Sequence, residues 1–113
     1  MQNLSWAAPI LPGKLDAWHR FNDEMQSRAD EHSASRKEMG IHREVVSLMP
    51  TPAGDFVCLY HEADDLAQAF HVLATSDSPY LQWFRQKCFE IHGLTPETLA
   101  GPPPAELTFD RPG

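Results

Sequence analysis

The stretch IHREVVSLMPTPAGDFVCLYHEA, residues 41–63, decides the fold of this chain. Two runs rich in Val, Ile, Phe and Tyr flank the sequence PTPAGD, residues 50–55, which holds two prolines, a glycine and an aspartate. Strand-forming residues on both sides of such a turn are typical of a β-hairpin. We therefore predict two antiparallel strands within this stretch.

The pairing register of this hairpin determines which side chains meet. Symmetric pairing about Pro52 places Glu44 opposite Tyr60. His42 then lies opposite Glu62, so all four side chains share one face of the hairpin. A slip of one residue moves every side chain to the other face and brings His42 towards His61. Neither face is cleanly polar, so we expect both to be covered.

Composition limits the partners of the chain. Its 113 residues predict one domain, and nine basic against sixteen acidic residues give a net charge of −7. This charge argues against binding to nucleic acid or to an anionic membrane. Cys58 and Cys88 are too few for a disulfide framework, which predicts buried free thiols in a reducing compartment. With no signal sequence and no apolar run near the ~18 residues of a membrane span, we expect a cytoplasmic protein.

The chain before the hairpin predicts a strand and a long helix. Residues 4–11 (LSWAAPIL) predict a strand that lies at a sheet edge or ends early, because Pro9 cannot donate to a central ladder. Residues 14–39 carry apolar side chains every three or four positions, which predicts one amphipathic helix that ends at Gly40. The stripe weakens after Ala29, where His32, Ser33 and Arg36 follow. That end either faces a pocket or a partner, or is an exposed last turn.

The chain after the hairpin predicts three further helices and an arm. The expected helices run from the pair Asp64 and Asp65 to Ser76, from Ser78 to Gly93, and from Thr95 to Gly101. Three prolines then form a stiff spacer, and ELTFD, residues 106–110, predicts a last short strand or arm. We divide the chain into a domain, residues 1–101, and a Pro-rich C-terminal arm, residues 102–113.

The predicted order of elements is βαββα with an optional last strand. This order is typical of an α+β, ferredoxin-like sheet with helices on one face. The simplest cover for the second face is the same face of a second chain. Such contact removes on the order of hundreds of Å² of apolar surface from water at roughly 25 cal/mol per Å². We therefore expect a homodimer through the sheet face, in the form of a dimeric α+β barrel.

Three sequence runs resemble a family of small uncharacterised proteins of the dimeric α+β barrel superfamily. They are PGK at 12–14, GIHREVVSLMPTPAGDFVCLYHEA at 40–63 and SDSPYLQWFRQ at 76–86, and the resemblance covers residues 10–94. It implies the fold and the dimer. Relatives across that superfamily include cofactor-independent monooxygenases of the antibiotic-biosynthesis type, polyketide cyclases, muconolactone isomerases, haem-dependent enzymes and ligand-sensing regulators. The resemblance carries over no catalytic residue.

The six histidines do not form a metal-binding motif. The sequence has no HExxH, HxH or HxxxH spacing of the kind that places two ligands on one face of an element. It also has no G-x-S-x-G motif and no Gly-rich phosphate loop, which disfavours hydrolase and nucleotide-binding classes. We predict no metal and no cofactor. The alternative is a metal or haem held by His61 or His42.

The candidate site follows from the symmetric register. A carboxylate beside a phenol in a water-poor cavity can hold a raised pKa and move a proton. We predict the catalytic residues Glu44, Tyr60 and His42. The predicted substrate-binding residues are Arg43, His61, Glu62 and Trp83. In the alternative, Glu44 forms an ion pair with Arg43 or Arg36, and Tyr60 forms a hydrogen bond across the dimer interface.

Two classes of function fit these residues. The first is a small-molecule enzyme, a cofactor-independent monooxygenase or a cyclase or isomerase that acts on an aromatic or polyketide-like metabolite. The second is a non-catalytic dimer that binds a metabolite or a protein. A cavity that contains Glu44 and Tyr60 favours the enzyme. A barrel filled by Val, Leu and Phe side chains favours the binding module.

Overall fold

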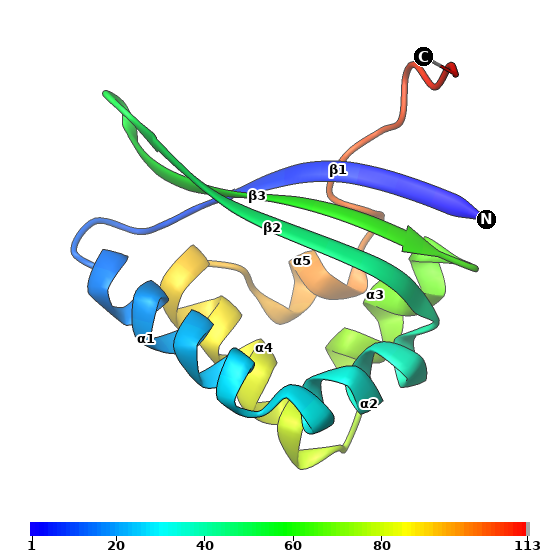
Figure 1. Cartoon of the computed structure of the whole chain (residues 1–113), viewed down its shortest axis with the longest axis horizontal. Coiled ribbons are helices and arrows are strands. Elements are labelled where there is room, and N and C mark those ends of the chain that lie inside the picture. Colours follow the sequence, from blue (N-terminus) through cyan, green and yellow to red (C-terminus); the bar gives the residue numbers. More distant parts are fainter. Residues whose placement is uncertain (113) are drawn as a thin grey trace.

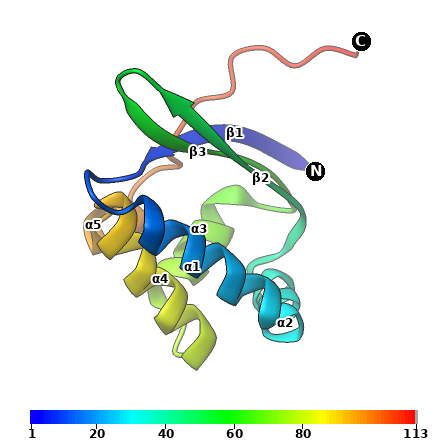
Figure 2. The ribbon, with the colours of Figure 1, turned by 60° about the vertical axis from the view of Figure 1, so that its left-hand side comes forward.

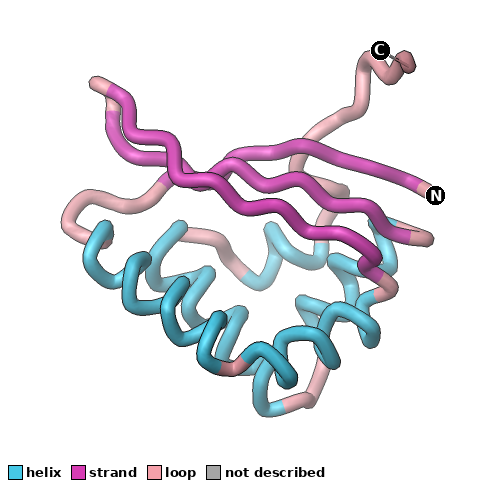
Figure 3. The backbone as a smooth tube through the Cα atoms, in the orientation of Figure 1, coloured by secondary structure: helices cyan, strands magenta, loops and turns pink. Residues whose placement is uncertain are grey.

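The sheet and the helices form two layers. In the computed structural model, which describes residues 1–112, three strands and five helices are present. The strands β1 (Gln2–Pro9), β2 (Ile41–Thr51) and β3 (Gly54–Ala63) form one antiparallel sheet in the order β1-β3-β2. All the helices lie against one face of this sheet (Figures 1 and 3). The predicted α+β class, with helices on one face, is confirmed.

The hairpin is confirmed, but the predicted register is wrong by one residue. Thr51 pairs with Gly54 across a two-residue turn, so the centre of the hairpin lies between Pro52 and Ala53 and not at Pro52 itself. Gly54 has a φ of 130°, which only glycine adopts without strain and which fixes this turn. Glu44 therefore lies opposite His61 instead of Tyr60. Because side chains alternate, Glu44 and Tyr60 lie on opposite faces of the sheet.

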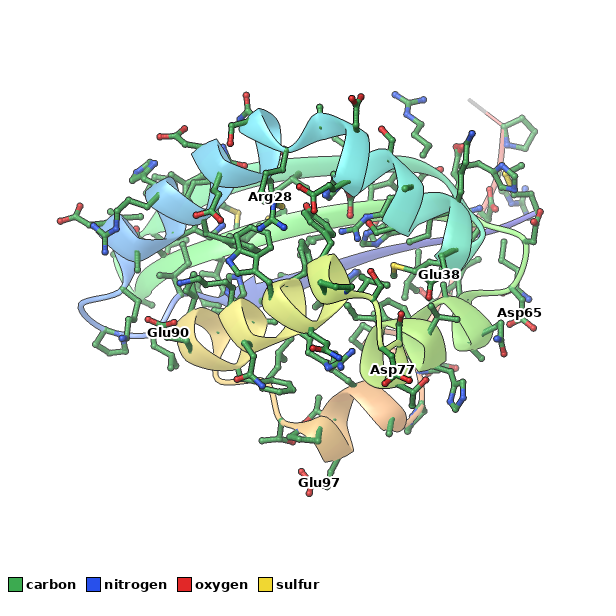
Figure 4. All side chains as sticks on the ribbon, turned by 90° about the horizontal axis from the view of Figure 1, so that it is seen from below. Arg28, Glu38, Asp65, Asp77, Glu90 and Glu97 are labelled. Atoms are coloured by element: carbon green, nitrogen blue, oxygen red, sulfur yellow. The ribbon has the colours of Figure 1, made fainter. Side chains whose placement is uncertain are left out.

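The predicted long helix is two helices, α1 (Leu15–Ser27) and α2 (Ala29–Met39). Arg28 separates them with a non-helical backbone, φ −108° and ψ 41°. Its guanidinium lies 4.5 Å from the ring of Trp83 and 4.9 Å from the ring of Tyr80. In Figure 4, Arg28 lies between the α1–α2 pair and the opposing helix. Tertiary contacts therefore accompany the break, which no Pro or Gly marks in the sequence.

The remaining helices are α3 (Leu66–Thr75), α4 (Pro79–His92) and α5 (Pro96–Ala100), close to their predicted limits. Asp65 caps α3 by accepting a hydrogen bond from the backbone of Gln68, as the sequence predicts. Residues 101–112 contain no strand, so of the two predicted forms of residues 106–110, a short strand or an arm, the strand is absent. These residues form an arm instead, anchored where Asn3 donates to Asp110. Gly113, the last residue of the predicted arm, lies outside the described residues.

Two apolar clusters join the helices to the inner face of the sheet. One contains Ala63 with Leu73 and Leu81. The other contains Val57 of β3, Ile91 of α4, and Trp18 and Phe21 of α1. Leu81, Ile91 and Ala63 have no exposed surface. These two clusters hold the helix layer against the sheet, and residues of both line the space between them.

The outer face of the sheet is uncovered. No helix lies over it in Figure 2, and the arm leaves the domain on this side. Val45 and Met49 are 39% and 43% exposed, and Phe56, Cys58 and Tyr60 beside them are half-buried. Cys58 is therefore less buried than predicted, whereas Cys88 is buried as expected, and both thiols are free. Among residues 1–112, no helix has the length and apolar character that a membrane crossing requires.

The packing of α4 predicts the stability of the domain. We expect Ile91→Ala to lower the free energy of unfolding by about 3 kcal/mol, because it opens a hole in a fully buried cluster. Gln86→Ala, at an exposed position of the same helix, is the control and should cost less than about 0.5 kcal/mol. Denaturant unfolding measures both. Equal losses in the two variants would contradict this description of the core.

Candidate functional site

A cavity of about 300 Å³ lies between the inner face of the sheet and the helices. This volume is at the lower end of the range of small-molecule sites. Its walls are mainly apolar and aromatic, and they include Trp18, Phe21 and Phe70. The exposed members of the lining all come from α1, α2 and β2, namely Gln26, Ala29, Ser33 and Val46. The mouth of the cavity is therefore on the α1–α2 side, next to β2.

A buried carboxylate stands in the wall of this cavity. Glu44 Oε1 lies 2.7 Å from His32 Nε2, and Glu44 Oε2 lies 3.1 Å from His61 Nε2. Arg36 donates to the same carboxylate, with Nη2 at 2.9 Å and Nε at 3.2 Å from Oε2. We call Glu44, His32, Arg36 and His61 the Glu44 cluster.

Two local rules bring the Glu44 cluster together. His32 and Arg36 are four residues apart on α2, so both side chains leave the helix on the same face. Glu44 and His61 are direct cross-strand partners and share the inner face of the sheet. The end of the α2 stripe, where the sequence loses its apolar character, therefore faces a pocket.

The electrostatics of Glu44 differ from the prediction. Burial by itself raises the pKa of a carboxyl group, but hydrogen bonds from His32 and His61 and the charge of Arg36 outweigh it. Together they hold the pKa of Glu44 well below its ordinary range. Glu44 is thus an ionised acceptor, and the predicted carboxyl group with a raised pKa is wrong. Groups that exchange a proton in this site must lie beside it.

The hydrogen bonds continue on both sides of the cluster. Trp6 Nε1 donates to His61 Nδ1 at 3.2 Å, and because indole nitrogen only donates, His61 carries its proton on Nε2. His32 Nδ1 lies 2.6 Å from the hydroxyl of Tyr80. Burial raises the pKa of Tyr80 to about 12, so its phenol stays protonated beside His32. The result is a continuous row from Trp6 through Glu44 to Tyr80.

The structure brings together only two of the predicted site residues, Glu44 and His61. Tyr60 and Glu62 lie on the outer face, where the Tyr60 hydroxyl donates to Glu62 at 2.9 Å. That hydrogen bond raises the pKa of Tyr60. Arg43 is exposed and pairs across the strands with Glu62. The predicted convergence of these residues with Glu44 fails because it depends on the symmetric register.

His42 and Trp83 also lie away from the cavity. The bulge between Ile41 and Arg43 takes His42 out of the ladder, and its Nε2 lies 2.8 Å from Asp64 at the surface. Trp83 packs on Phe21 behind the cavity wall. Neither residue reaches the Glu44 cluster. The shifted register brings His61 inwards, but the bulge keeps His42 away from it.

Sequence reasoning gave no hydrogen-bonding role to His32, Trp6 and Tyr80. Arg36 was expected only in the alternative, as an ion-pair partner of Glu44, and this ion pair is present at 2.9 Å. His32 and Arg36 gave a signal, because two polar residues four apart continue the buried stripe of a helix. Trp6 could be assigned only to one face of the first strand, from the alternation of side chains, and an indole at such a position usually packs in the core. Tyr80 gave no signal in the sequence, because the turn that precedes α4 determines where this side chain lies.

The Glu44 cluster does not have the geometry of a metal site. Among residues 1–112, no group of three His, Cys, Asp or Glu side chains is arranged to hold a metal ion. The guanidinium of Arg36 also occupies the carboxylate that would serve as the anionic ligand. The donor set therefore suits hydrogen bonding and proton exchange.

The fold and the site define an α+β protein with an apolar cavity and a buried, charged polar row. The chain belongs to the family of unknown function DUF6176, whose model matches residues 1–104. The match contains every residue of the cavity and of the Glu44 cluster. No curated protein and no solved structure matches the chain.

The Glu44 cluster predicts a pH-dependent stability. Glu44→Gln leaves the buried Arg36 without its counter-charge, so we expect the free energy of unfolding at pH 7 to fall by about 3 kcal/mol. A carboxyl group with a lowered native pKa stabilises above its unfolded pKa, and the stability is lost as pH falls. The native protein should therefore lose stability between roughly pH 5 and roughly pH 3, more steeply than Glu44→Gln.

The matched control is Glu62→Gln. It makes the same change to a carboxylate on the neighbouring strand, but on the outer face of the sheet. It should change the free energy of unfolding by less than about 1 kcal/mol and keep the steep pH profile. Denaturant titrations from pH 3 to pH 7 give both quantities. Identical pH profiles for the native protein and Glu44→Gln would show that Glu44 is not the ionised centre of the site.

Proposed function

We propose that this protein is a small-molecule enzyme that transfers a proton within its apolar cavity. The proposed class is a cofactor-independent monooxygenase or a cyclase or isomerase, acting on an aromatic or polyketide-like metabolite. One observation carries the proposal: an ionised carboxylate, held between two imidazoles, stands in the wall of a ligand-sized cavity. The aromatic walls suit a flat, apolar substrate.

His32 is the proposed proton acceptor. Its side chain lines the cavity and is 21% exposed, against 15% for Glu44 and 6% for His61, so it is the most accessible of the three. A substrate hydroxyl that replaces Tyr80 at Nδ1 gives its proton to a ring whose Nε2–H already faces Glu44. The carboxylate stabilises the imidazolium that forms, as an orienting acid does behind a catalytic histidine. A dry cavity strengthens this interaction.

The ferredoxin-like, dimeric barrel arrangement is part of this proposal. The strand order β1-β3-β2, with a helical connection between β1 and β2, is the order that a split βαβ unit gives. The uncovered outer face supports a second copy as its partner. Exposed Leu107 and Phe109 on the arm extend the apolar surface beside that face. The cavity, however, lies within one chain and is complete without a partner.

A non-catalytic, metabolite-binding module is the second candidate. In the described part of the chain, every buried side-chain nitrogen or oxygen already has a hydrogen-bond partner. A polar network satisfied in this way also serves as a structural support for the cavity wall. Ligand binding without turnover would therefore favour the binding module over the enzyme.

Blocking the mouth tests the cavity. In a thermal-shift screen of neutral aromatic and alicyclic compounds, we expect some to raise the melting temperature of the native protein. Ala29→Trp places a large ring at the mouth and should abolish these shifts, whereas Ala34→Trp, exposed on the same helix, should keep them. For a compound that is turned over, His32→Gln should lower kcat by about 10²- to 10⁴-fold. Tyr60→Phe should retain activity.

A screen without any binder would contradict a ligand-binding cavity. Binders that are never turned over would favour the metabolite-binding module. Equal turnover by His32→Gln and the native protein would remove His32 from the mechanism.

The outer face predicts a dimer. We expect sedimentation equilibrium to show a dimer, and Met49→Glu to raise its dissociation constant at least about tenfold, because a charge would enter an apolar contact. Gln82→Glu, exposed on α4, carries the same added charge and should leave the dimer intact. A native protein that stays monomeric at every concentration would refute the barrel.

A further inference from the structure

His92 is a second polar residue of the cavity, away from the Glu44 cluster. It is the last residue of α4, lines the cavity and is only 8% exposed. Its Nδ1 lies 2.8 Å from the carbonyl oxygen of Pro9. Because a carbonyl only accepts, Nδ1 carries a proton and the ring orientation is fixed.

The other ring nitrogen of His92, Nε2, has no hydrogen-bond partner within residues 1–112 and is accessible, since no fully buried side-chain nitrogen in that range is unpaired. Burial lowers the pKa of His92, although the hydrogen bond to Pro9 opposes this shift, so the ring is neutral at pH 7. A neutral ring protonated on Nδ1 has a free lone pair on Nε2. His32 and His61, in contrast, use both ring nitrogens. His92 thus offers the one histidine lone pair of the described cavity lining that the protein itself leaves open.

We propose that Nε2 of His92 recognises a hydroxyl group of a neutral aromatic ligand. This inference rests on the proposed function, because it requires that the cavity bind a small molecule. It deepens that function by assigning the chemical class of the ligand and a specificity residue. The class is a phenol or a similar flat molecule with a hydrogen-bond donor.

The surroundings of His92 favour a neutral donor. Ala8, Val57 and Leu94 are apolar neighbours in the lining, so they stabilise neither charge. Glu44 and Arg36 compensate each other at close range, which leaves the cavity without a free charge from this pair. An imidazole lone pair accepts hydrogen bonds and donates none. Ethers and ketones therefore gain nothing at His92, whereas a hydroxyl does.

His92 and the Glu44 cluster contact β1 at different points along the strand. His61 pairs with Leu4 on β1, and His92 bonds to Pro9, five residues further along the same strand. Five residues of strand span roughly 16 Å. A ligand can thus be held by its hydroxyl at His92 while another part of it extends towards His32.

Two probes of nearly equal shape test the inference. We expect 2-naphthol, which has a hydroxyl donor, to bind the native protein at least about fivefold more tightly than 2-methoxynaphthalene, which has none. His92→Phe should remove this preference, and His71→Phe, exposed on α3, should preserve it. Isothermal titration calorimetry measures the six affinities, two probes for each of the three proteins. In the native protein, the ¹⁵N resonance of His92 Nε2 should shift with 2-naphthol and stay in place with the ether.

The outcomes separate the two proposals. If both probes bind with equal affinity and the Nε2 resonance does not move, the role of His92 is refuted and the cavity function stands. If neither probe binds, the proposed function fails and the role of His92 fails with it. The resonance measurement needs no variant, so an unfolded His92→Phe protein does not prevent a decision.

Discussion

The ionised carboxylate of Glu44 is the constraint on which the structure depends. A buried charge must be compensated, and the compensating groups come from α2 and from β3. Glu44 therefore ties the helix layer to the sheet at a place where the apolar clusters leave a gap. The same pairing keeps polar groups at the cavity wall, where an apolar side chain would have filled the space. One interaction thus supports the fold and preserves the cavity.

Local signals in the sequence predicted most of the elements. The hairpin, the cap at Asp65 and the helix end at Gly40 all follow from short-range preferences and are confirmed. The break at Arg28 was missed because its contacts with Tyr80 and Trp83 come from a helix more than 50 residues later in the chain. Of the predicted strand or arm at residues 106–110, only the arm is present, because ELTFD has the composition of a strand but no neighbour in the sheet.

The candidate site was only half predictable, for a geometric reason. A register error of a single residue exchanges the two faces, so Tyr60 and Glu62 moved out and His61 moved in. His32 and Arg36 were visible as polar residues on a buried stripe, but their partner depends on the register. The sequence pattern does not reveal the backbone geometry of the turn at Gly54, and this geometry sets the pairing register of the two strands.

The two edges of the sheet have a consequence for how chains can meet. β1 and β2 are the outer strands, and free backbone groups at such positions invite pairing with other chains. β1 ends in Pro9, β2 carries Pro50 and the bulge at its start, and each of these features interrupts a regular ladder. Sideways extension into a continuous intermolecular sheet is thereby discouraged. The proline and bulge positions at both rims of the sheet thus disfavour fibrous aggregation.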